Sequence, residues 1–271
     1  MRIQKAITES GFASRREAER LIIEGHVQVN NETIYHPNTQ VDLKKDNILI
    51  DGQPLPVPEK KVYYAYHKPK GVICSRQDPQ NRPSVYDHLA LLPYRIESIG
   101  RLDFNTSGLL LFTNDGTLAH SLTHPKFDIP KKYRVKVWKK PDERQLNRIR
   151  RGITLEDGRT KPAKVRIIDN TETNNTWLEI TLTEGKNRLI RRMFEAINHP
   201  VSKLKRVSFA GIGIGKLDVK KYRPLTGIEV ERLRAVARGE DPQKIKKFEY
   251  KKGFARPKIK KSPLRKRHKK K

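Results

Sequence analysis

The fold is constrained most by residues 99–116, IGRLDFNTSGLLLFTNDG. This stretch carries Arg101 and Asp103 on a polar turn, and the apolar run LLLFT at 109–113 follows that turn. A short apolar run between turn residues is typical of a buried β-strand. We therefore expect a strand whose start holds a charged turn in a fixed position. Taken alone, Asp103 is also typical of a turn or capping residue.

Further strands are predicted on both sides of this stretch, in segments rich in aromatic and β-branched residues. They are VYYAYHK (62–68), YRVKVW (133–138), WLEITLT (177–183) and VSFAGIGIG (207–215). Helical spacing of apolar residues predicts two helices between them, DERQLNRIRRG (142–152) and NRLIRRMFEAIN (187–198). The class is therefore α+β, with much of the sheet antiparallel.

A separate small N-terminal unit of two helices and a hairpin is predicted as well. Residues 52–61, GQPLPVPEKK, place three prolines within five positions, which indicates a linker. Upstream, Ser14 with Glu17 fits a capping box that opens a helix, and Gly25 fits the end of that helix. Asn30-Asn31 lies between two short apolar-alternating runs, which is a hairpin signal. The expected parts of the chain are residues 1–58, 59–238 and a C-terminal tail at 239–271.

The composition indicates a polyanionic partner. The 271 residues include 59 Lys and Arg against 30 Asp and Glu, a formal net charge of +29. Nucleic acid is the first candidate for such a charge, and an anionic membrane is second because no long amphipathic helix with a bulky apolar face is evident. The single cysteine, Cys74, excludes an internal disulfide and a multi-cysteine metal site. Without a bilayer-length apolar run or a signal-peptide core, we expect a soluble, cytoplasmic protein.

The charge is concentrated in the tail. Residues 239–271 carry 15 Lys and Arg against three acids, and three prolines interrupt them. Such a segment cannot bury a core, so we expect it to be disordered in isolation. Two interpretations stay open, a solvated tail that aids solubility and an arm that binds the phosphate backbone.

Three familiar motifs are incomplete. GIGIGK at 211–216 lacks the Ser or Thr of a phosphate-binding loop, so its glycines are expected to relieve a tight turn. His120 and His124 have zinc-ligand spacing, but the catalytic Glu of that motif is missing, which favours capping or packing. Ser107 lacks the preceding glycine of a hydrolase elbow. No metal site and no nucleotide cofactor site is predicted.

Two other segments offer polar side chains. Tyr133 lies near the start of the strand at 133–138. EGKNRLIRRMF places Arg188, Arg191 and Arg192 at the start of a helix, where the macrodipole already attracts anions. An acid, a tyrosine and an arginine could form one polar cluster, although spacing alone does not show that they converge.

The motifs together carry a resemblance. The chain resembles the RsuA/RluB family of bacterial rRNA pseudouridine synthases over roughly residues 2–235, and its N-terminal part resembles the S4 RNA-binding domain that members of this family carry. The family motifs are GRLDFNTSGLLLFTNDG (100–116), KKYRVKV (131–137), TEGKNRLIRRMFEAINHPVSKLKRVSFAGIGIG (183–215) and KYRPLT (221–226), and the S4 motif is ASRREAERLIIEGHVQVNN (13–31). CSRQDPQNRPSVYDHL (74–89) resembles the large-subunit rRNA branch in particular.

The resemblance implies roles for individual residues. Asp103 would be the essential aspartate, Tyr133 would stack against the target base, and Arg191 would form a salt bridge to the aspartate. Arg101 would help to hold the flipped-out nucleotide. Leu189 departs from the family, which usually has Gln at that position. The implied catalytic fold is a mixed, mostly antiparallel sheet flanked by helices, and the family needs no cofactor.

The expected function is the isomerisation of a uridine to pseudouridine in ribosomal RNA, with 23S rRNA or a ribosomal subunit precursor as partner. The expected RNA contacts come from seven basic residues, Arg15, Arg16, Arg20, Arg101, Lys186, Arg188 and Arg192. The chain is expected to act as a monomer, without a membrane or a small-molecule cofactor. Two alternatives stay open, a small-subunit 16S rRNA pseudouridine synthase and a non-catalytic S4-type ribosome-assembly factor.

Overall fold

A computed structural model describes residues 1–169 and 175–240 of the chain. The tail predicted for residues 239–271 therefore lies outside the described residues from position 241 onward. In the described part, no helix is both long enough and apolar enough to cross a membrane.

The N-terminal part forms two helices packed on a small antiparallel sheet with strand order β2-β1-β3-β4. The elements are α1 (Ile3–Glu9), α2 (Arg15–Ile23), β1 (Val27–Val29), β2 (Glu32–Thr33), β3 (Ile48–Ile50) and β4 (Gln53–Pro54). Their apolar side chains form one core, which includes Ile3, Ile7, Ile22, Val27 and Ile50. The predicted pair of helices with a hairpin is thus confirmed, and a second hairpin completes the sheet.

Local signals account for these boundaries. The Ser14 side chain accepts a hydrogen bond from the backbone N–H of Glu17, and Gly25 follows the helix in a left-handed conformation. Asn30 and Asn31 both have positive φ, as the predicted two-residue turn requires. The hairpin β3–β4, which was not predicted, has the same kind of two-residue turn with positive φ at Asp51-Gly52. The Asp-Gly pair is a hairpin signal that the sequence contains.

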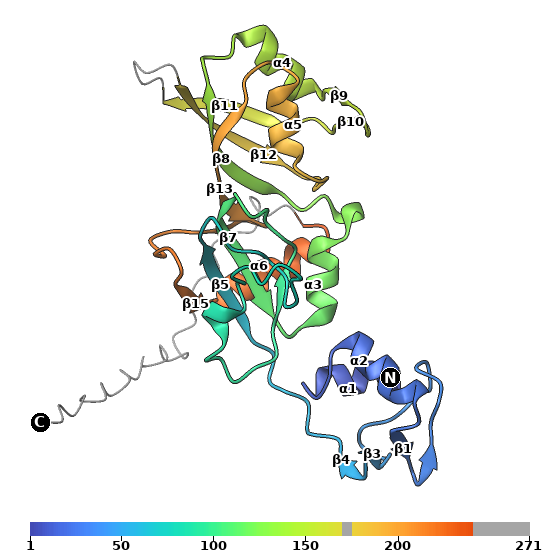
Figure 1. Cartoon of the computed structure of the whole chain (residues 1–271). Helices are drawn as coiled ribbons and strands as arrows, with labels where there is room; N and C mark the ends of the chain where they lie inside the picture. The colour runs from blue at the N-terminus through green and yellow to red at the C-terminus, as the bar shows by residue number, and fades with distance from the viewer. Residues whose placement is uncertain (170–174, 241–271) are drawn as a thin grey trace, which may run out of the picture.

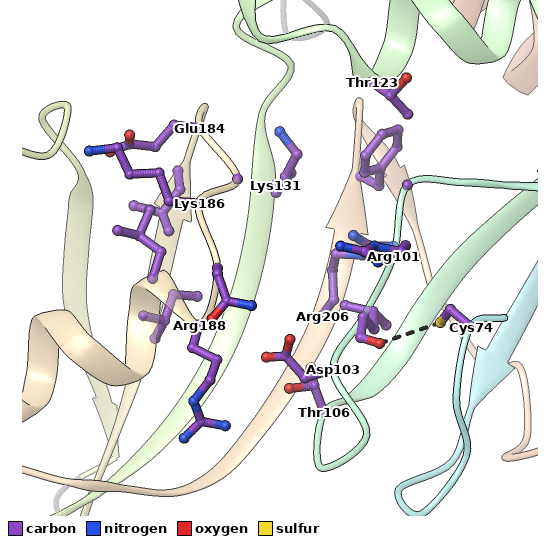
Figure 2. A pocket seen from close by; sticks show the side chains of 18 of the residues that line it. Cys74, Arg101, Asp103, Thr106, Thr123, Lys131, Glu184, Lys186, Arg188 and Arg206 are labelled. Carbon is purple, nitrogen blue, oxygen red and sulfur yellow. Dashed lines mark hydrogen bonds between the residues drawn. The ribbon is translucent and has the colours of Figure 1, made fainter. Parts of the chain in front are cut away.

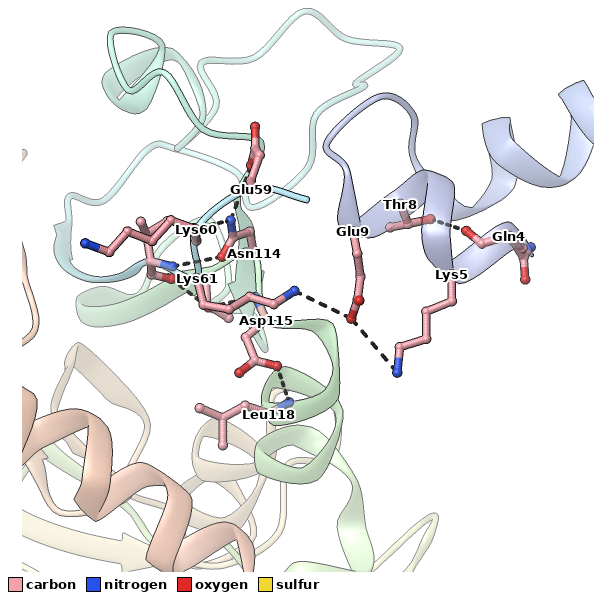
Figure 3. Close-up of polar contacts among 12 residues, drawn as sticks. Gln4, Lys5, Thr8, Glu9, Glu59, Lys60, Lys61, Asn114, Asp115 and Leu118 are labelled. Carbon is pink, nitrogen blue, oxygen red and sulfur yellow. Dashed lines mark hydrogen bonds and ion pairs between the residues drawn. The ribbon is translucent and has the colours of Figure 1, made fainter. Parts of the chain in front are cut away.

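The linker is held by polar contacts to both sides (Figure 3). Glu9 of α1 forms an ion pair with Lys61 at 3.5 Å, and its carbonyl accepts a hydrogen bond from the backbone N–H of Glu59. Asn114, at the end of β7 (Ser107–Thr113), donates to the Glu59 carboxylate and to the Lys60 carbonyl. The N-terminal part is therefore joined to the rest of the chain through a small polar junction.

The rest of the chain is built on a nine-stranded sheet. Seven of its strands follow the order β11-β12-β8-β13-β7-β5-β15, and the other two, β14 and β6, pair with β13 and β7, respectively. Every strand pair is antiparallel except β13 with β7, which is parallel. The remaining strands are β5 (Tyr63–Lys68), β6 (Glu97–Ile99), β8 (Lys131–Trp138), β11 (Lys164–Asp169), β12 (Asn175–Leu182), β13 (Val201–Phe209), β14 (Ile212–Gly213), β15 (Tyr222–Pro224) and the separate hairpin β9 (Thr154–Leu155) with β10 (Gly158–Arg159). The predicted mixed, mostly antiparallel sheet is confirmed.

Helices cover the sheet in two groups (Figure 1). One group packs with β8, β11 and β12 around a core that includes Leu146, Ile149, Met193 and Phe194, and the other packs near β5 and β7. The helices are α4 (Glu143–Arg151) and α5 (Leu189–Glu195) in the first group, α3 (Gly116–Thr123) and α6 (Gly227–Ala237) in the second, and the short turns η1 (Asp87–Leu89) and η2 (Pro125–Phe127).

The central strand β7 is buried on both faces. Leu109 and Leu111 face the core under α3 and α6, whereas Leu110 and Phe112 face a second core built from the segment 72–102. A strand buried on both faces has a continuous apolar run instead of an alternating pattern. This burial explains the LLLF run and fixes the turn at residues 103–106 between two packed layers.

One predicted strand has the wrong extent. The segment 207–215 was expected to be a single strand, but β13 starts at Val201 and ends at Phe209. Ala210 and Gly211, both with positive φ, then turn the chain into β14. The lysines of VSKLKRVSF hid the strand because they lie on its less buried positions. The expected role of the glycines at 211–216 in a tight turn is confirmed at Gly211.

Candidate active site

A cavity of about 1030 Å³ opens where the turn before β7 meets β8 and the segment before α5. Asp103, Arg101, Tyr133, Lys186 and Arg188 all line it, although they come from three separate parts of the sequence. Figure 2 shows the Asp103 carboxylate and the Arg188 side chain entering the cavity from different elements. The fold therefore brings five of the candidate site residues together.

A buried lysine holds the turn that carries Asp103 through the backbone carbonyls of that turn. The Lys68 side chain is fully buried, and its ammonium donates to the carbonyls of Asp103 and Thr106 at 3.0 Å each. It also donates to the carbonyl of Pro69 at 3.1 Å. Burial lowers the pKa of Lys68, while the nearby charge of Asp103 acts in the opposite direction. Lys68 thus fixes the backbone on which the partly exposed Asp103 carboxylate is mounted.

Arg191 lies behind this turn and outside the cavity lining. Its Nη2 donates to the carbonyl of Asn105 and its Nη1 to the carbonyl of Val201, both at 3.1 Å. Among the residues that the structure describes, no ion pair within 4.0 Å joins Arg191 to Asp103, which differs from the expected salt bridge. The two carbonyls instead hold Nη1 and Nη2, while the buried Nε has no hydrogen-bond partner within the described residues. Burial lowers the pKa of Arg191 and the charge of Asp103 raises it, so the two groups interact without direct contact.

Tyr133 is placed by the register of the sheet. It lies on β8 opposite Ile180 of β12 and Arg206 of β13, and its side chain is partly buried at the cavity wall. An aromatic face at this position can stack against a base that enters the cavity.

Two further cations lie at the cavity and were not singled out from the sequence. Arg206 is 2% exposed, and its Nε donates to the carbonyl of Leu109 at 2.7 Å. Lys131 donates to the carbonyls of Ile129 and Thr183, and burial lowers the pKa of its ammonium to about 8. Arg206 also lowers the pKa of both Lys68 and Lys131, so the three cations form one region of positive potential. Such a region favours an anionic ligand.

These groups differ in how visible they were in the sequence. Leu204 and Arg206 lie two positions apart on β13 and are both buried, so recognition of this strand in the sequence would have placed Arg206 on the same face as Leu204. Lys68 ends a strand of aromatic residues just before a proline, and nothing local distinguishes it from an exposed lysine.

Arg192 is turned away from the cavity. Its guanidinium forms a two-pronged ion pair with Asp157, in the hairpin β9–β10, at 2.7 and 3.1 Å. Lys186 donates to the carbonyl of the same Asp157 at 3.2 Å while it lines the cavity. Arg188 is exposed at the start of α5 with a left-handed backbone. Of the three helix-start arginines, only Arg188 therefore lines the cavity.

The arginines of α2 are exposed. Arg20 is paired with Glu17 and with Glu24, the latter at 3.5 Å. Arg15 and Arg16 form no ion pair within the described residues and remain available for a polyanion. Of the three arginines of α2 that are expected to contact RNA, only Arg20 is thus partly neutralised by acidic neighbours within the described residues.

The two histidines four positions apart have structural contacts. His124 accepts a hydrogen bond from the backbone N–H of Lys126, and its ring packs edge-on against that of His120 at 5.3 Å. The expected capping and packing are confirmed. Across residues 1–169 and 175–240, no group of three or more His, Cys, Asp or Glu side chains could hold a metal ion.

The fold and cavity define a class of protein, one in which a carboxylate on the turn before a buried strand and an aromatic side chain line the same cationic cavity. Residues 62–196 match the family model for RNA pseudouridylate synthase, and residues 1–54 match that for the S4 domain. The chain belongs to the RNA pseudouridylate synthase family, which confirms the resemblance found in the sequence.

Individual relatives agree with this membership. Ribosomal large subunit pseudouridine synthase B of Bacillus subtilis (strain 168) is 45% identical over 237 residues, which cover 87% of this chain and 96% of that protein. An uncharacterised RNA pseudouridine synthase of Aquifex aeolicus (strain VF5) is 40% identical and covers 86% of this chain and 93% of its own. A crystal structure of a pseudouridylate synthase superposes with a TM-score of 0.63 at 31% identity, over 86% of this chain and 99% of that one.

Proposed function

We propose that this protein isomerises a specific uridine of large-subunit 23S rRNA to pseudouridine, with Asp103 as the catalytic carboxylate. The observation that carries the proposal is the Asp103 turn, which the buried Lys68 holds at a cationic cavity in a chain of this family. The choice of large-subunit RNA draws on residues 74–89 and on the name of the Bacillus subtilis relative.

The reaction is balanced without an external reactant. The N1–C1′ bond breaks with its electrons leaving on the uracil, the base turns over, and C5 then bonds to C1′. The proton on C5 leaves and N1 gains one, so no atom is added to or lost from the nucleotide. The Asp103 carboxylate can attack C1′ as a nucleophile or remove the C2′ proton as a base, and both roles require its ionised form.

The neighbours of Asp103 suit both routes. Arg191 adds a positive charge behind the Asp103 turn, and its guanidinium is held there by the carbonyls of Asn105 and Val201. Tyr133 supplies an aromatic face for the detached uracil, a contact worth about 1–3 kcal/mol per base. Arg101 and Arg188 line the mouth and are suited to hold the flipped-out nucleotide by its phosphates.

The N-terminal domain supplies a second RNA-binding surface through Arg15, Arg16 and Arg20. Lys186 extends the cationic surface of the cavity, and Arg192 supports the position of Lys186 through their shared partner Asp157. We place the domain boundaries at residues 1–58, 59–238 and 239–271. A monomer is sufficient, because every group invoked comes from one chain, and the bacterial cytoplasm, where rRNA is made, is the proposed compartment.

The test compares two isosteric variants of the full chain on 23S and 16S rRNA transcripts, with pseudouridines mapped at nucleotide resolution. Asp103→Asn should lose conversion by at least about 1000-fold while RNA binding in a filter assay stays within about threefold. Asp218→Asn changes an exposed aspartate outside the cavity lining and should leave both measurements unchanged.

Three results would contradict parts of this proposal. Conversion of 16S rRNA alone would replace the large-subunit substrate by a small-subunit one. Retained turnover in Asp103→Asn would remove Asp103 from its role. RNA binding by the unaltered protein without conversion of either RNA would favour a ribosome-assembly factor.

A further inference from the structure

One wall of the cavity is a loop at residues 73–84 that the reaction chemistry leaves without a role. Its two ends are paired, because the backbone N–H groups of Ile73 and Val85 donate to the carbonyls of Pro83 and Ile73, both at 2.9 Å. The Ser84 hydroxyl donates to the Ser75 carbonyl and closes the loop further. The loop is therefore a formed structure and not a loose excursion.

Within this loop, Asp78 holds Arg82 in one orientation. Arg82 donates to the Asp78 carboxylate from Nε at 3.0 Å, from Nη2 at 2.6 Å and from its backbone N–H at 2.9 Å. The Asp78 side chain is 9% exposed and that of Arg82 is 42% exposed. Both residues line the cavity, and Nη1 of Arg82 has no hydrogen-bond partner in the parts of the chain that the structure describes. A two-pronged carboxylate pair of this kind leaves the free edge of the guanidinium presented to a ligand.

Phe104 lies beside this arginine and directly follows Asp103. The Phe104 residue is 40% exposed and lines the cavity, and Cζ of Arg82 is 5.9 Å from its ring centroid. Its backbone is fixed, because its carbonyl accepts from the N–H of Gly71 at 2.9 Å. An aromatic ring that lines a cavity beside a guanidinium has an open face on which a ligand can stack.

The cavity also has room for more than the target nucleoside. Its volume of about 1030 Å³ lies just above the range of roughly 300–1000 Å³ that encloses a drug-sized ligand. An exposed aromatic ring next to a guanidinium is the combination that stacks a nucleobase and contacts its phosphate.

We propose that Phe104 and Arg82 form a subsite for the nucleotide adjacent to the target uridine. Its base stacks on Phe104, and its phosphate accepts hydrogen bonds from Nη1 of Arg82, while Asp78 is a positioning residue for Arg82. This subsite rests on the proposed function, because it assigns a neighbour to the uridine that Asp103 attacks. It explains why the loop at 73–84 is shaped as a cavity wall.

The test uses the full chain and the rRNA transcript that the unaltered protein converts. Phe104→Ala should raise the RNA concentration for half-maximal rate about 5- to 150-fold, the range that one stacked base supplies, with kcat changed less than threefold. Phe104→Trp, which keeps an aromatic face, should restore the affinity. Arg82→Ala should weaken binding and reduce its salt dependence by about one phosphate contact. The matched controls Leu91→Ala and Arg166→Ala change exposed residues outside the cavity lining and should leave both parameters unaltered.

A substrate series separates stacking from a structural role. Two RNAs are compared with the intact one, each abasic at the nucleotide on one side of the uridine. On one of the two, Phe104→Ala should cause no further loss of affinity, because the base that Phe104 contacts is absent. The subsite would be overturned if Phe104→Ala bound the intact RNA as tightly as the unaltered protein does. It would also be overturned if Phe104→Ala lost the same affinity on the intact RNA and on both abasic RNAs. In either case, conversion by the unaltered protein would still uphold the proposed function. Absence of any conversion by the unaltered protein would overturn both.

Discussion

Replacement of Lys68 by methionine tests whether a buried ammonium holds the turn that carries Asp103. Methionine keeps the length and apolar stem of the side chain but removes the donors to the carbonyls of Pro69, Asp103 and Thr106. The Asp103 carbonyl keeps a second donor, the backbone N–H of Thr106 at 3.0 Å, whereas the carbonyls of Pro69 and Thr106 lose the ammonium. A buried carbonyl left without a donor costs about 1–3 kcal/mol. The variant no longer has to desolvate an ammonium, which offsets part of this loss. We therefore expect the free energy of unfolding to fall by about 2–4 kcal/mol.

The same change should reduce turnover in the molecules that remain folded. Without the ammonium, the turn at 103–106 loses its fixed position, and a displacement of about 1 Å at a reacting group costs about 100-fold in rate. For a domain of about 180 residues, 2–4 kcal/mol corresponds to a fall of about 4–16 °C in Tm.

Thermal unfolding and single-turnover pseudouridine formation measure the two effects, both well below the Tm of the variant. Lys60→Met, at an exposed lysine of the linker, is the matched control and should change neither quantity. Unfolding free energy within about 1 kcal/mol of the unaltered protein, together with an unchanged kcat, would show that Lys68 does not hold the turn.

Three other predictions concern different parts of the chain. Gly108→Ala should lower stability by at least about 3 kcal/mol in urea unfolding, because the new Cβ would lie 2.2 Å from the carbonyl oxygen of Arg206 at a φ of +117°, whereas Gly116→Ala meets no atom within 4 Å and should be neutral. The pKa of Lys131 falls from 10.5 unfolded to about 8 in the fold, so the unfolded chain binds more protons between these values. Stability should therefore rise with pH from about 8 to 10.5, by at most about 3 kcal/mol, and Lys131→Met should flatten this rise; an unchanged pH profile would contradict it. Deletion of residues 239–271, with 15 Lys and Arg, should weaken RNA binding and flatten its salt dependence while conversion survives at high enzyme concentration, and an equal salt slope would return the tail to a solvated role.

The sequence by itself determined the elements whose causes are local. Ser14 caps its helix through a backbone N–H three residues away, and Asn30-Asn31 turns a hairpin between adjacent strands. Both depend on backbone dihedral angles and on hydrogen bonds between residues that are close in sequence, so the local sequence is enough to predict them. The LLLF run likewise predicted β7, because a strand buried on both faces needs apolar residues at every position.

The arrangement of the candidate site could not be predicted from local sequence. Family motifs named Asp103 and Tyr133, but only the packed sheet brought them to one cavity, through pairing of β8 with β13 and of β13 with β7. Spacing placed Arg192 with Arg188, whereas the fold turned Arg192 to Asp157. A hydrogen bond across 35 residues has no signature in either local segment.

Only the tertiary structure determined which hydrogen-bond partners the buried cations have. Lys68 and Arg206 were not singled out from the sequence, and Arg191 was expected to pair with Asp103. Each is buried, and each donates to at least one backbone carbonyl far along the chain, that of Asp103, Leu109 or Asn105, respectively. Burial makes an unsatisfied donor or carbonyl costly, so the packed fold, and not the neighbouring residues, selects the partner. That selection sets the positive potential around Asp103 and the position of its turn.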